Sequence, residues 1–358
     1  MQFTTTSAAR RRPLTWVVVM MTMALALPGL GCGSDDSGGG SGKETVEIAF
    51  FGLAAENAYT QYMFRAAEDE AKKLDANLQF FDGKFEGPAQ VTQMQDAITS
   101  GRYQGFIVMP NDQSGIVPVV EQALAEGIKV AALQFPIGSD PTDEEPQVKG
   151  VTTSVIEDVV RGAEITAEGI NAMCEGRDPC EVGILWGDRT VTWEVAKQKP
   201  LEEALDPNVR IVAQADAGFL QGPGEKATAD MLEAHPELDV LATPSGDQMT
   251  TGGQRAIEAE NKPIGLGDRP DDAIAIVGYG ASKTGVERVR NKDWYQTYAL
   301  VPQTMSREAL RVLVEEVRGT RPKPSRRGIV QTEISPVGDN ITLGVLKENP
   351  DWKAEWEG

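Results

Sequence analysis

The sequence contains few of the side chains that most often bind metals or act as catalytic bases. Only one histidine and three cysteines occur among its 358 residues. The histidine, His235, precedes a proline in a predicted turn, so it is poorly placed for a Ser-His-Asp or Cys-His arrangement. Cys174 and Cys180 lie close together without a nearby histidine, which leaves them short of the four ligands of a zinc site. We therefore expect no metal, no cofactor and no catalytic triad.

Positive charge is also scarce. The chain has 34 Lys and Arg residues against 54 Asp and Glu residues, a formal net charge of −20. Such a protein repels phosphate backbones, so nucleic acid is excluded as a partner. The acidity is explained by the solubility of an exported protein and requires no acidic binding function. The hydrophobic fraction of 41% is near the globular average, and the length suffices for two domains.

The N-terminal apolar run, residues 16–27, is too short to span a bilayer comfortably, because a bilayer core requires about 20 apolar residues. Three arginines at 10–12 precede it, and the small residues at 28–31 follow it. This order is typical of a cleaved secretory leader, here residues 1–31. The leader predicts export from the cytoplasm.

Cys32 directly follows this leader. The residues before it resemble the lipobox of bacterial lipoproteins, in which the cysteine carries the lipid, although Gly29 stands where leucine is usual and Leu30 follows it. Residues 32–44 are rich in Gly, Ser and Asp, which predicts a flexible tether. We therefore expect an extracytoplasmic protein anchored to the membrane through a lipid on Cys32. The alternative is a plain secretory leader cut nearby, which would leave an odd free thiol.

The other two cysteines, Cys174 and Cys180, enclose the turn-rich residues Glu-Gly-Arg-Asp-Pro. Outside the cytoplasm such a pair is expected to form a local disulfide.

Short apolar runs alternate with segments of helical periodicity from Val46 onward, which predicts an α/β fold with parallel sheets covered by helices on both faces. The acidic loop 140–145 separates two such blocks. The predicted strands are 46–51, 78–81, 105–109 and one ending at 135, then 181–186, 210–215, 240–243 and 274–279. Two doubly wound lobes create a cleft, and parallel sheets bind ligands at the carboxyl ends of their strands. We therefore expect the functional site in the cleft.

Several local motifs are familiar in their order and spacing. They are Asn57-Ala58-Tyr59, Pro110-Asn111-Asp112, the turn at 234–238, Asp247, Gly278-Tyr279-Gly280 and the segment 299–302. Over residues 46 to about 332 the chain resembles the periplasmic sugar-binding proteins related to the ribose-binding protein. The resemblance implies the type I periplasmic binding fold, whose two lobes are joined by a three-strand hinge.

The same resemblance implies where the chain crosses between lobes, near Val151, Pro302 and Thr332. The first lobe would then hold residues 45–150 and 303–330, and the second 151–302 and 331–358. It further implies a monomeric, non-enzymatic lipoprotein that binds a small solute, such as a sugar, for the membrane permease of an ABC importer. A sensory protein that presents a non-sugar solute to a chemoreceptor or kinase would suit the same fold, and a glycosidase with two cleft carboxylates is a third, disfavoured alternative.

The candidate ligand-binding residues follow from the resemblance. They are Asn57, Tyr59, Gln134, Phe135, Arg189, Trp193, Asp247 and Tyr279. Gln134-Phe135 stands where the family carries an Asp-Arg pair, and Leu300 stands where it carries a glutamine, so the polar sugar contacts are fewer than usual.

Each candidate also has a structural explanation. Asn57 and Asp247 would cap helices, and Trp193 would pack in a core. The segment 278–284 superficially resembles a phosphate loop, but Ser282 occupies the position of the required glycine, so a strand-to-helix turn is the simpler interpretation.

Overall fold

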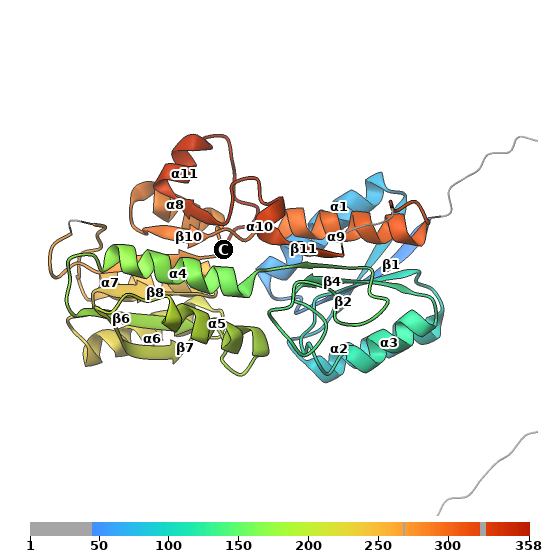
Figure 1. Cartoon of the computed structure of the whole chain (residues 1–358), viewed down its shortest axis with the longest axis horizontal. Helices are drawn as coiled ribbons and strands as arrows, with labels where there is room; N and C mark the ends of the chain where they lie inside the picture. Colours follow the sequence, from blue (N-terminus) through green and yellow to red (C-terminus); the bar gives the residue numbers. More distant parts are fainter. Residues whose placement is uncertain (1–44, 268, 323–326) are drawn as a thin grey trace, which may run out of the picture. The chain divides into compact units, whose positions relative to one another are not determined.

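The computed structural model describes residues 45–267, 269–322 and 327–358. The expected leader 1–31, the tether 32–44 and the lipid-bearing Cys32 lie outside the described residues. Two six-stranded sheets organise the rest (Figure 1). Among the helices in the described ranges, none combines the length and apolarity needed to cross a bilayer.

The first sheet is entirely parallel, with the strand order β11-β5-β4-β3-β1-β2. Its strands are β1 (Val46–Gly52), β2 (Ala76–Asp82), β3 (Gly105–Val108), β4 (Lys129–Gln134), β5 (Thr153–Ile156) and β11 (Gly328–Val330). The central strands β3 and β5 are buried along their whole length, because helices cover both faces of the sheet.

Helices on the first sheet bury one apolar face each. On one side lie α1 (Ala58–Lys73) and α9 (Pro302–Val317), on the other α2 (Gly87–Ser100) and α3 (Val117–Ala125). Met63 of α1 and Met305 of α9 belong to the same buried cluster, although the sequence separates them widely. Figure 1 shows α9 beside α1 for this reason.

The second sheet has the equivalent order, β12-β10-β9-β8-β6-β7. Its strands are β6 (Cys180–Trp186), β7 (Val209–Asp216), β8 (Val240–Ala242), β9 (Ala275–Tyr279), β10 (Gln296–Tyr298) and β12 (Asn340–Thr342). All neighbouring pairs are parallel except β10 with β12. The fold is therefore the predicted one of two α/β lobes, with a single antiparallel edge pair in the second.

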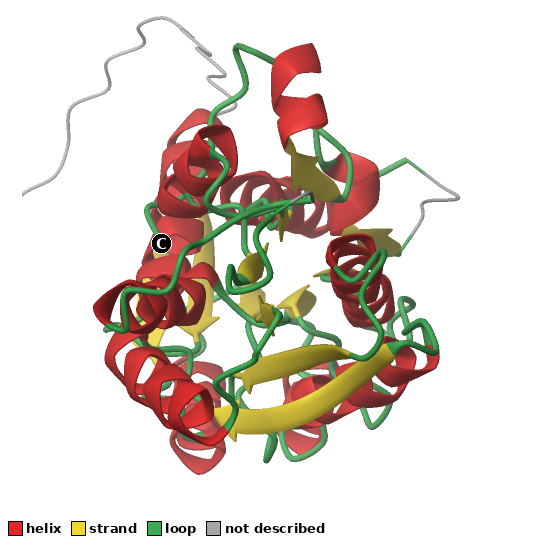
Figure 2. Ribbon diagram, turned by 90° about the vertical axis from the view of Figure 1, so that its left-hand side faces the viewer, coloured by secondary structure: helices red, strands yellow, loops and turns green. Residues whose placement is uncertain are grey.

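Helices also cover both faces of this second sheet (Figure 2). One face carries α4 (Val159–Met173) and α5 (Thr192–Glu203). The other carries α6 (Gln221–Ala234), α7 (Asp247–Ala259) and α8 (Lys283–Asn291). The short helices α10 (Gln331–Ile334) and α11 (Leu343–Glu348) follow β11 and β12.

Within the described residues, the chain passes between the sheets at three places. The first lies after Ile156, because β5 pairs with β4 and β11 in the first sheet, whereas the sequence had suggested a crossing near Val151. The second lies between Tyr298 at the end of β10 and the start of α9, and the third between β11 and β12. The short strand β5 lacks a long apolar run, which explains why the boundary was placed too early.

Cys174 and Cys180 are joined by the expected disulfide, with their Cα atoms 5.5 Å apart. It closes the loop between α4 and β6. Within the described ranges, no three His, Cys, Asp or Glu side chains are grouped so as to hold a metal ion.

Candidate functional site

A cavity of about 100 Å³ lies at the carboxyl ends of strands from both sheets. Six of the expected residues line it: Asn57, Tyr59, Gln134, Phe135, Trp193 and Tyr279. Ten further residues complete the wall: Leu53, Phe85, Glu157, Lys197, Phe219, Ser245, Gly246, Gln248, Leu300 and Trp356. The site therefore forms where open parallel sheets are expected to bind ligands.

Asn57 serves both roles considered for it. Its Oδ1 accepts hydrogen bonds from the backbone N–H of Thr60 at 2.8 Å and from the Thr60 hydroxyl at 3.0 Å, which caps the first turn of α1. The same side chain lines the cavity. Capping fixes the Asn57 carbonyl oxygen and leaves its amide hydrogens to the cavity.

Gln134, the last residue of β4, has a positive φ of 70° and is only 3% exposed. A non-glycine residue in this left-handed region is uncommon, and such conformations cluster at functional sites. The conformation lets its amide bridge two partners, since Tyr59 donates to its Oε1 at 2.7 Å and its Nε2 donates to Glu157 at 2.6 Å.

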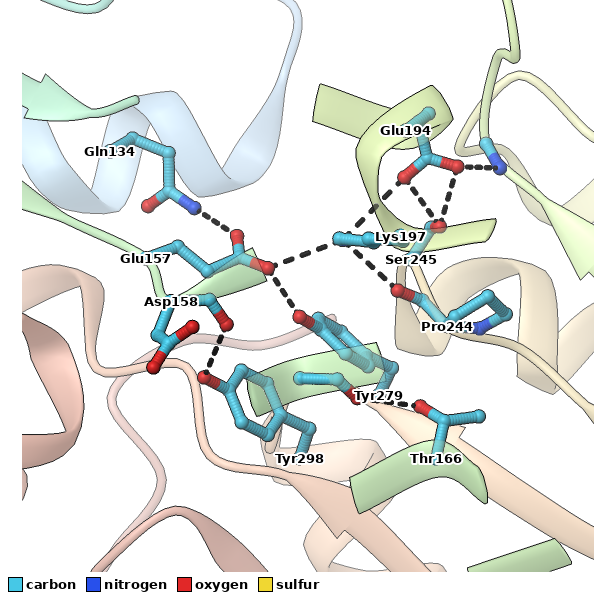
Figure 3. A network of polar contacts seen from close by, with 12 residues as sticks. Gln134, Glu157, Asp158, Thr166, Glu194, Lys197, Pro244, Ser245, Tyr279 and Tyr298 are labelled. Carbon is cyan, nitrogen blue, oxygen red and sulfur yellow. Dashed lines mark hydrogen bonds and ion pairs between the residues drawn. The ribbon is translucent and has the colours of Figure 1, made fainter. Parts of the chain in front are cut away.

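A buried ion cluster forms the floor of the site (Figure 3). The ammonium of Lys197 lies 3.2 Å from the Glu157 carboxylate and 3.6 Å from that of Glu194, and all three side chains are at least 97% buried. The Tyr279 hydroxyl donates to Glu157 as well, and the Ser245 hydroxyl donates to Glu194 at 2.7 Å. Glu157 follows β5, whereas Lys197 and Glu194 are on α5, so the cluster joins the two lobes.

Burial raises the pKa of Glu194, because desolvation penalises its charged form. Three neighbouring groups lower the pKa of Glu194 and partly offset this rise: the Lys197 ammonium, the Ser245 hydroxyl and the Gly187 N–H. Burial likewise raises the pKa values of Tyr59 and Tyr279 well above the usual range, so both phenols are neutral donors at physiological pH.

Aromatic rings form the other walls. Phe135, next to β4, stacks on Trp193 of α5 with ring centroids 4.4 Å apart and an interplanar angle of 13°. Phe219 lies 5.3 Å beyond Trp193. This stack also joins the lobes, and it gives the cavity flat apolar surfaces suited to stacking on a ring.

The C-terminal segment supplies an unexpected wall residue, Trp356. Its indole N–H donates to the Gly280 carbonyl at 2.7 Å, and its ring meets Tyr59 edge-on at 5.3 Å. The neighbouring Glu355 accepts from the backbone N–H groups of Gln303 and Thr304 at the start of α9. The segment therefore contacts both lobes.

Two expected ligand-binding residues lie elsewhere. Asp247 is fully buried at the start of α7, where its carboxylate accepts hydrogen bonds from Ser282 at 2.7 Å and from Thr297 at 2.9 Å. Arg189 pairs at 2.8 Å with Asp216 at the end of β7. Neither lines the cavity, because each is engaged by partners within the second lobe.

Sequence reasoning missed the ion cluster. Its signal was present in α5, where Glu194, Lys197 and Leu201 recur at helical spacing and share the buried face. Charged residues on the same stripe as a core leucine indicate a buried polar network. Trp356 follows no periodic segment, so no pattern identified it.

Comparisons with known proteins identify the family. Residues 48–321 match the periplasmic binding protein domain family. A D-ribose/D-allose-binding protein of Pseudomonas aeruginosa is 24% identical over 253 residues, which cover 70% of this chain and 74% of that protein.

Solved structures share the fold. A solute-binding protein of an Actinobacillus succinogenes ABC transporter with bound D-allose has a TM-score of 0.71 at 20% identity, covering 85% of this chain and all of that one. A Mycobacterium smegmatis protein in complex with β-D-fucofuranose has a TM-score of 0.72 at 19% identity, with coverages of 86% and 95%. Because the family match spans residues 48–321, most of the two lobes, the chain belongs to the periplasmic binding protein domain family.

Proposed function

We propose that the protein is the extracytoplasmic solute-binding component of an ABC importer and that it binds a small, neutral, sugar-like solute in the cavity between its lobes. The observation that carries this proposal is the cavity itself, where amides from helix and strand ends meet flat aromatic rings from both lobes. Aromatic faces stack on the C–H surface of a sugar ring, and amides bond its hydroxyls. The relatives that bind D-allose and fucofuranose support the same solute class.

The three crossings would act as a hinge. A solute that contacts both lobes stabilises the closed conformation, because some of its contacts form only when the lobes are closed. Gln134 and Phe135 on one side and Trp193 and Tyr279 on the other provide such contacts. A permease that recognises the closed form would then receive loaded protein selectively.

We propose no covalent chemistry. Glycoside hydrolysis usually requires two carboxyl groups that flank the substrate. Among the described residues lining the cavity, Glu157 is the only carboxylate, and it is ion-paired with Lys197. This arrangement favours binding over catalysis.

An extracytoplasmic monomer anchored by a lipid on Cys32 completes the proposal. The Cys174–Cys180 disulfide supports an oxidising compartment. Metabolic labelling with a radioactive fatty acid tests the anchor, since a Cys32→Ala variant should lose the label.

Thermal unfolding of the purified full-length chain with sugars, polyols, amino acids and nucleosides tests solute binding. A solute at 100 times its Kd adds about 2.7 kcal/mol to the free energy of unfolding, which should raise the Tm by several degrees. Phe135→Ala should abolish the shift, whereas Phe64→Ala, which truncates a ring packed against Phe50 and Phe80, should keep it. No shift with any sugar or polyol at millimolar concentration would contradict the proposal.

A further inference from the structure

The polar groups of the cavity are largely occupied by one another. An ammonium group has three hydrogens, and that of Lys197 faces three acceptors: the Pro244 carbonyl at 3.1 Å, Glu157 at 3.2 Å and Glu194 at 3.6 Å. The separation of 3.6 Å from Glu194 is an ion pair and too long for a hydrogen bond, so Lys197 keeps at most one hydrogen for a solute.

The residues around Glu157 are similarly committed (Figure 3). One oxygen of the Glu157 carboxylate accepts a hydrogen bond from the Tyr279 hydroxyl and forms the ion pair with Lys197. The other oxygen accepts a hydrogen bond from the Gln134 amide. The Tyr59 hydroxyl hydrogen goes to Gln134. The hydroxyl hydrogens of Tyr59 and Tyr279 and the ammonium group of Lys197 therefore all interact with other residues of the network.

Little hydrogen-bonding capacity remains for a solute. Among the described hydrogen bonds of the lining residues, none uses the Asn57 amide hydrogens, the Trp193 indole N–H or the Gln248 side chain. Gln134 keeps one amide hydrogen, and Glu157 keeps one acceptor position. These groups suit a few polar atoms and not a ring that bears a hydroxyl on every carbon.

Apolar surface dominates the rest of the wall. Phe135, Trp193 and Phe219 follow one another in a stack, and Leu300 lies near the second crossing. Phe85 lines the cavity while remaining 49% exposed, so a bound solute would cover an apolar ring that now faces solvent. A hydroxyl buried against these rings would lose its water without gaining a partner.

On this basis we infer that the solute is sparsely hydroxylated: a deoxy sugar or a glycoside with an apolar aglycone, presenting a flat apolar face to Phe135 and Trp193. This inference rests on the proposed function. Each hydroxyl left unpaired in the cavity should weaken binding by about tenfold or more.

Titration calorimetry of the full-length chain with matched pairs tests the inference. D-Allose is compared with 6-deoxy-D-allose, D-ribose with 2-deoxy-D-ribose, and methyl β-D-ribofuranoside with its phenyl counterpart. The deoxygenated or aryl member of at least one pair should bind ten times more tightly. In Trp193→Ala the preference for the phenyl glycoside should be lost.

A gain of polarity provides the complementary variant. Leu300→Gln adds an amide to the cavity wall at nearly constant side-chain volume. It should strengthen binding of the parent sugars and so reduce, several-fold, the preference for the deoxy or phenyl member of each pair. Tighter binding of every parent sugar by the unmodified protein would overturn the inference and leave the proposed function standing. Absence of binding by all members, with the protein folded by circular dichroism, would overturn both.

Discussion

Lys197 offers the sharpest test of how the site is held together. It is 1% exposed and lies between two buried carboxylates, at 3.2 Å from Glu157 and 3.6 Å from Glu194. Removing one partner of a buried ion pair leaves an uncompensated charge, which typically costs about 3–5 kcal/mol. Lys197→Met keeps most of the volume of the side chain and removes its charge together with its hydrogen bond to the Pro244 carbonyl, so we expect a loss of about that size in the free energy of unfolding.

The loss should depend on pH, because Glu194 already has a raised pKa and Lys197 is the main group that opposes the rise. Without the ammonium, the folded-state pKa of Glu194 rises further above its unfolded value of about 4.5. A carboxyl group with a raised folded pKa contributes its full stability below the unfolded pKa and loses it as pH rises through the folded pKa. Lys197→Met should therefore be less destabilised at pH 5 than at pH 8.

Urea unfolding at both pH values measures this difference. The triple variant Lys197→Met, Glu157→Gln, Glu194→Gln removes all three charges and should recover stability to within about 1 kcal/mol of the unmodified protein, because neutral replacements of buried ion clusters are often tolerated. A loss below about 1 kcal/mol, or an equal loss at pH 5 and pH 8, would refute the reasoning.

Three further outcomes are expected. Burial raises the pKa of Asp247 to about 6 from a usual 3.8, so the unmodified protein should lose about 3 kcal/mol between roughly pH 4 and 7 from this group, and urea titration of Asp247→Asn should show a smaller loss. A Cβ at Gly162 would lie 2.2 Å from the Tyr279 hydroxyl oxygen, so calorimetry of Gly162→Ala should show solute affinity about tenfold weaker, and unchanged affinity would contradict this packing. Replacing Cys174 and Cys180 with alanine should cost about 2 kcal/mol by loop-closure entropy, and a urea midpoint unaffected by the change would argue against it.

The main strands were predictable because they are apolar runs between turns. The central strands β1, β3, β6 and β9 all fall within a residue or so of the predicted ranges. The strands missed were the short ones of three or four residues, β5, β10, β11 and β12, because none of them contains a long apolar run. Their pairing is set by the chain crossings, which are long-range contacts that local patterns do not encode.

Residues that line the cavity were predictable where they end a strand, as Gln134 and Tyr279 do. Glu157 and Lys197 were missed because an isolated charged residue usually faces solvent, and only their mutual pairing permits burial. Asp247 was predicted to contact the solute but does not line the cavity. A polar residue at the start of a helix can equally well hydrogen-bond to neighbouring strands and loops, as Asp247 does with Ser282 and Thr297. Sequence position alone does not distinguish these outcomes.

The position of two tryptophans gives the protein a built-in optical reporter. Trp193 on α5 and Trp356 in the C-terminal segment both line the cavity, whereas Trp186 and Trp294 are fully buried in the second lobe. A solute that enters the cavity beside the Phe135–Trp193 stack changes the polarity around an indole without any added dye. Intrinsic fluorescence can therefore screen unmodified protein against large solute collections, and single substitutions of Trp193 or Trp356 by phenylalanine separate the two signals.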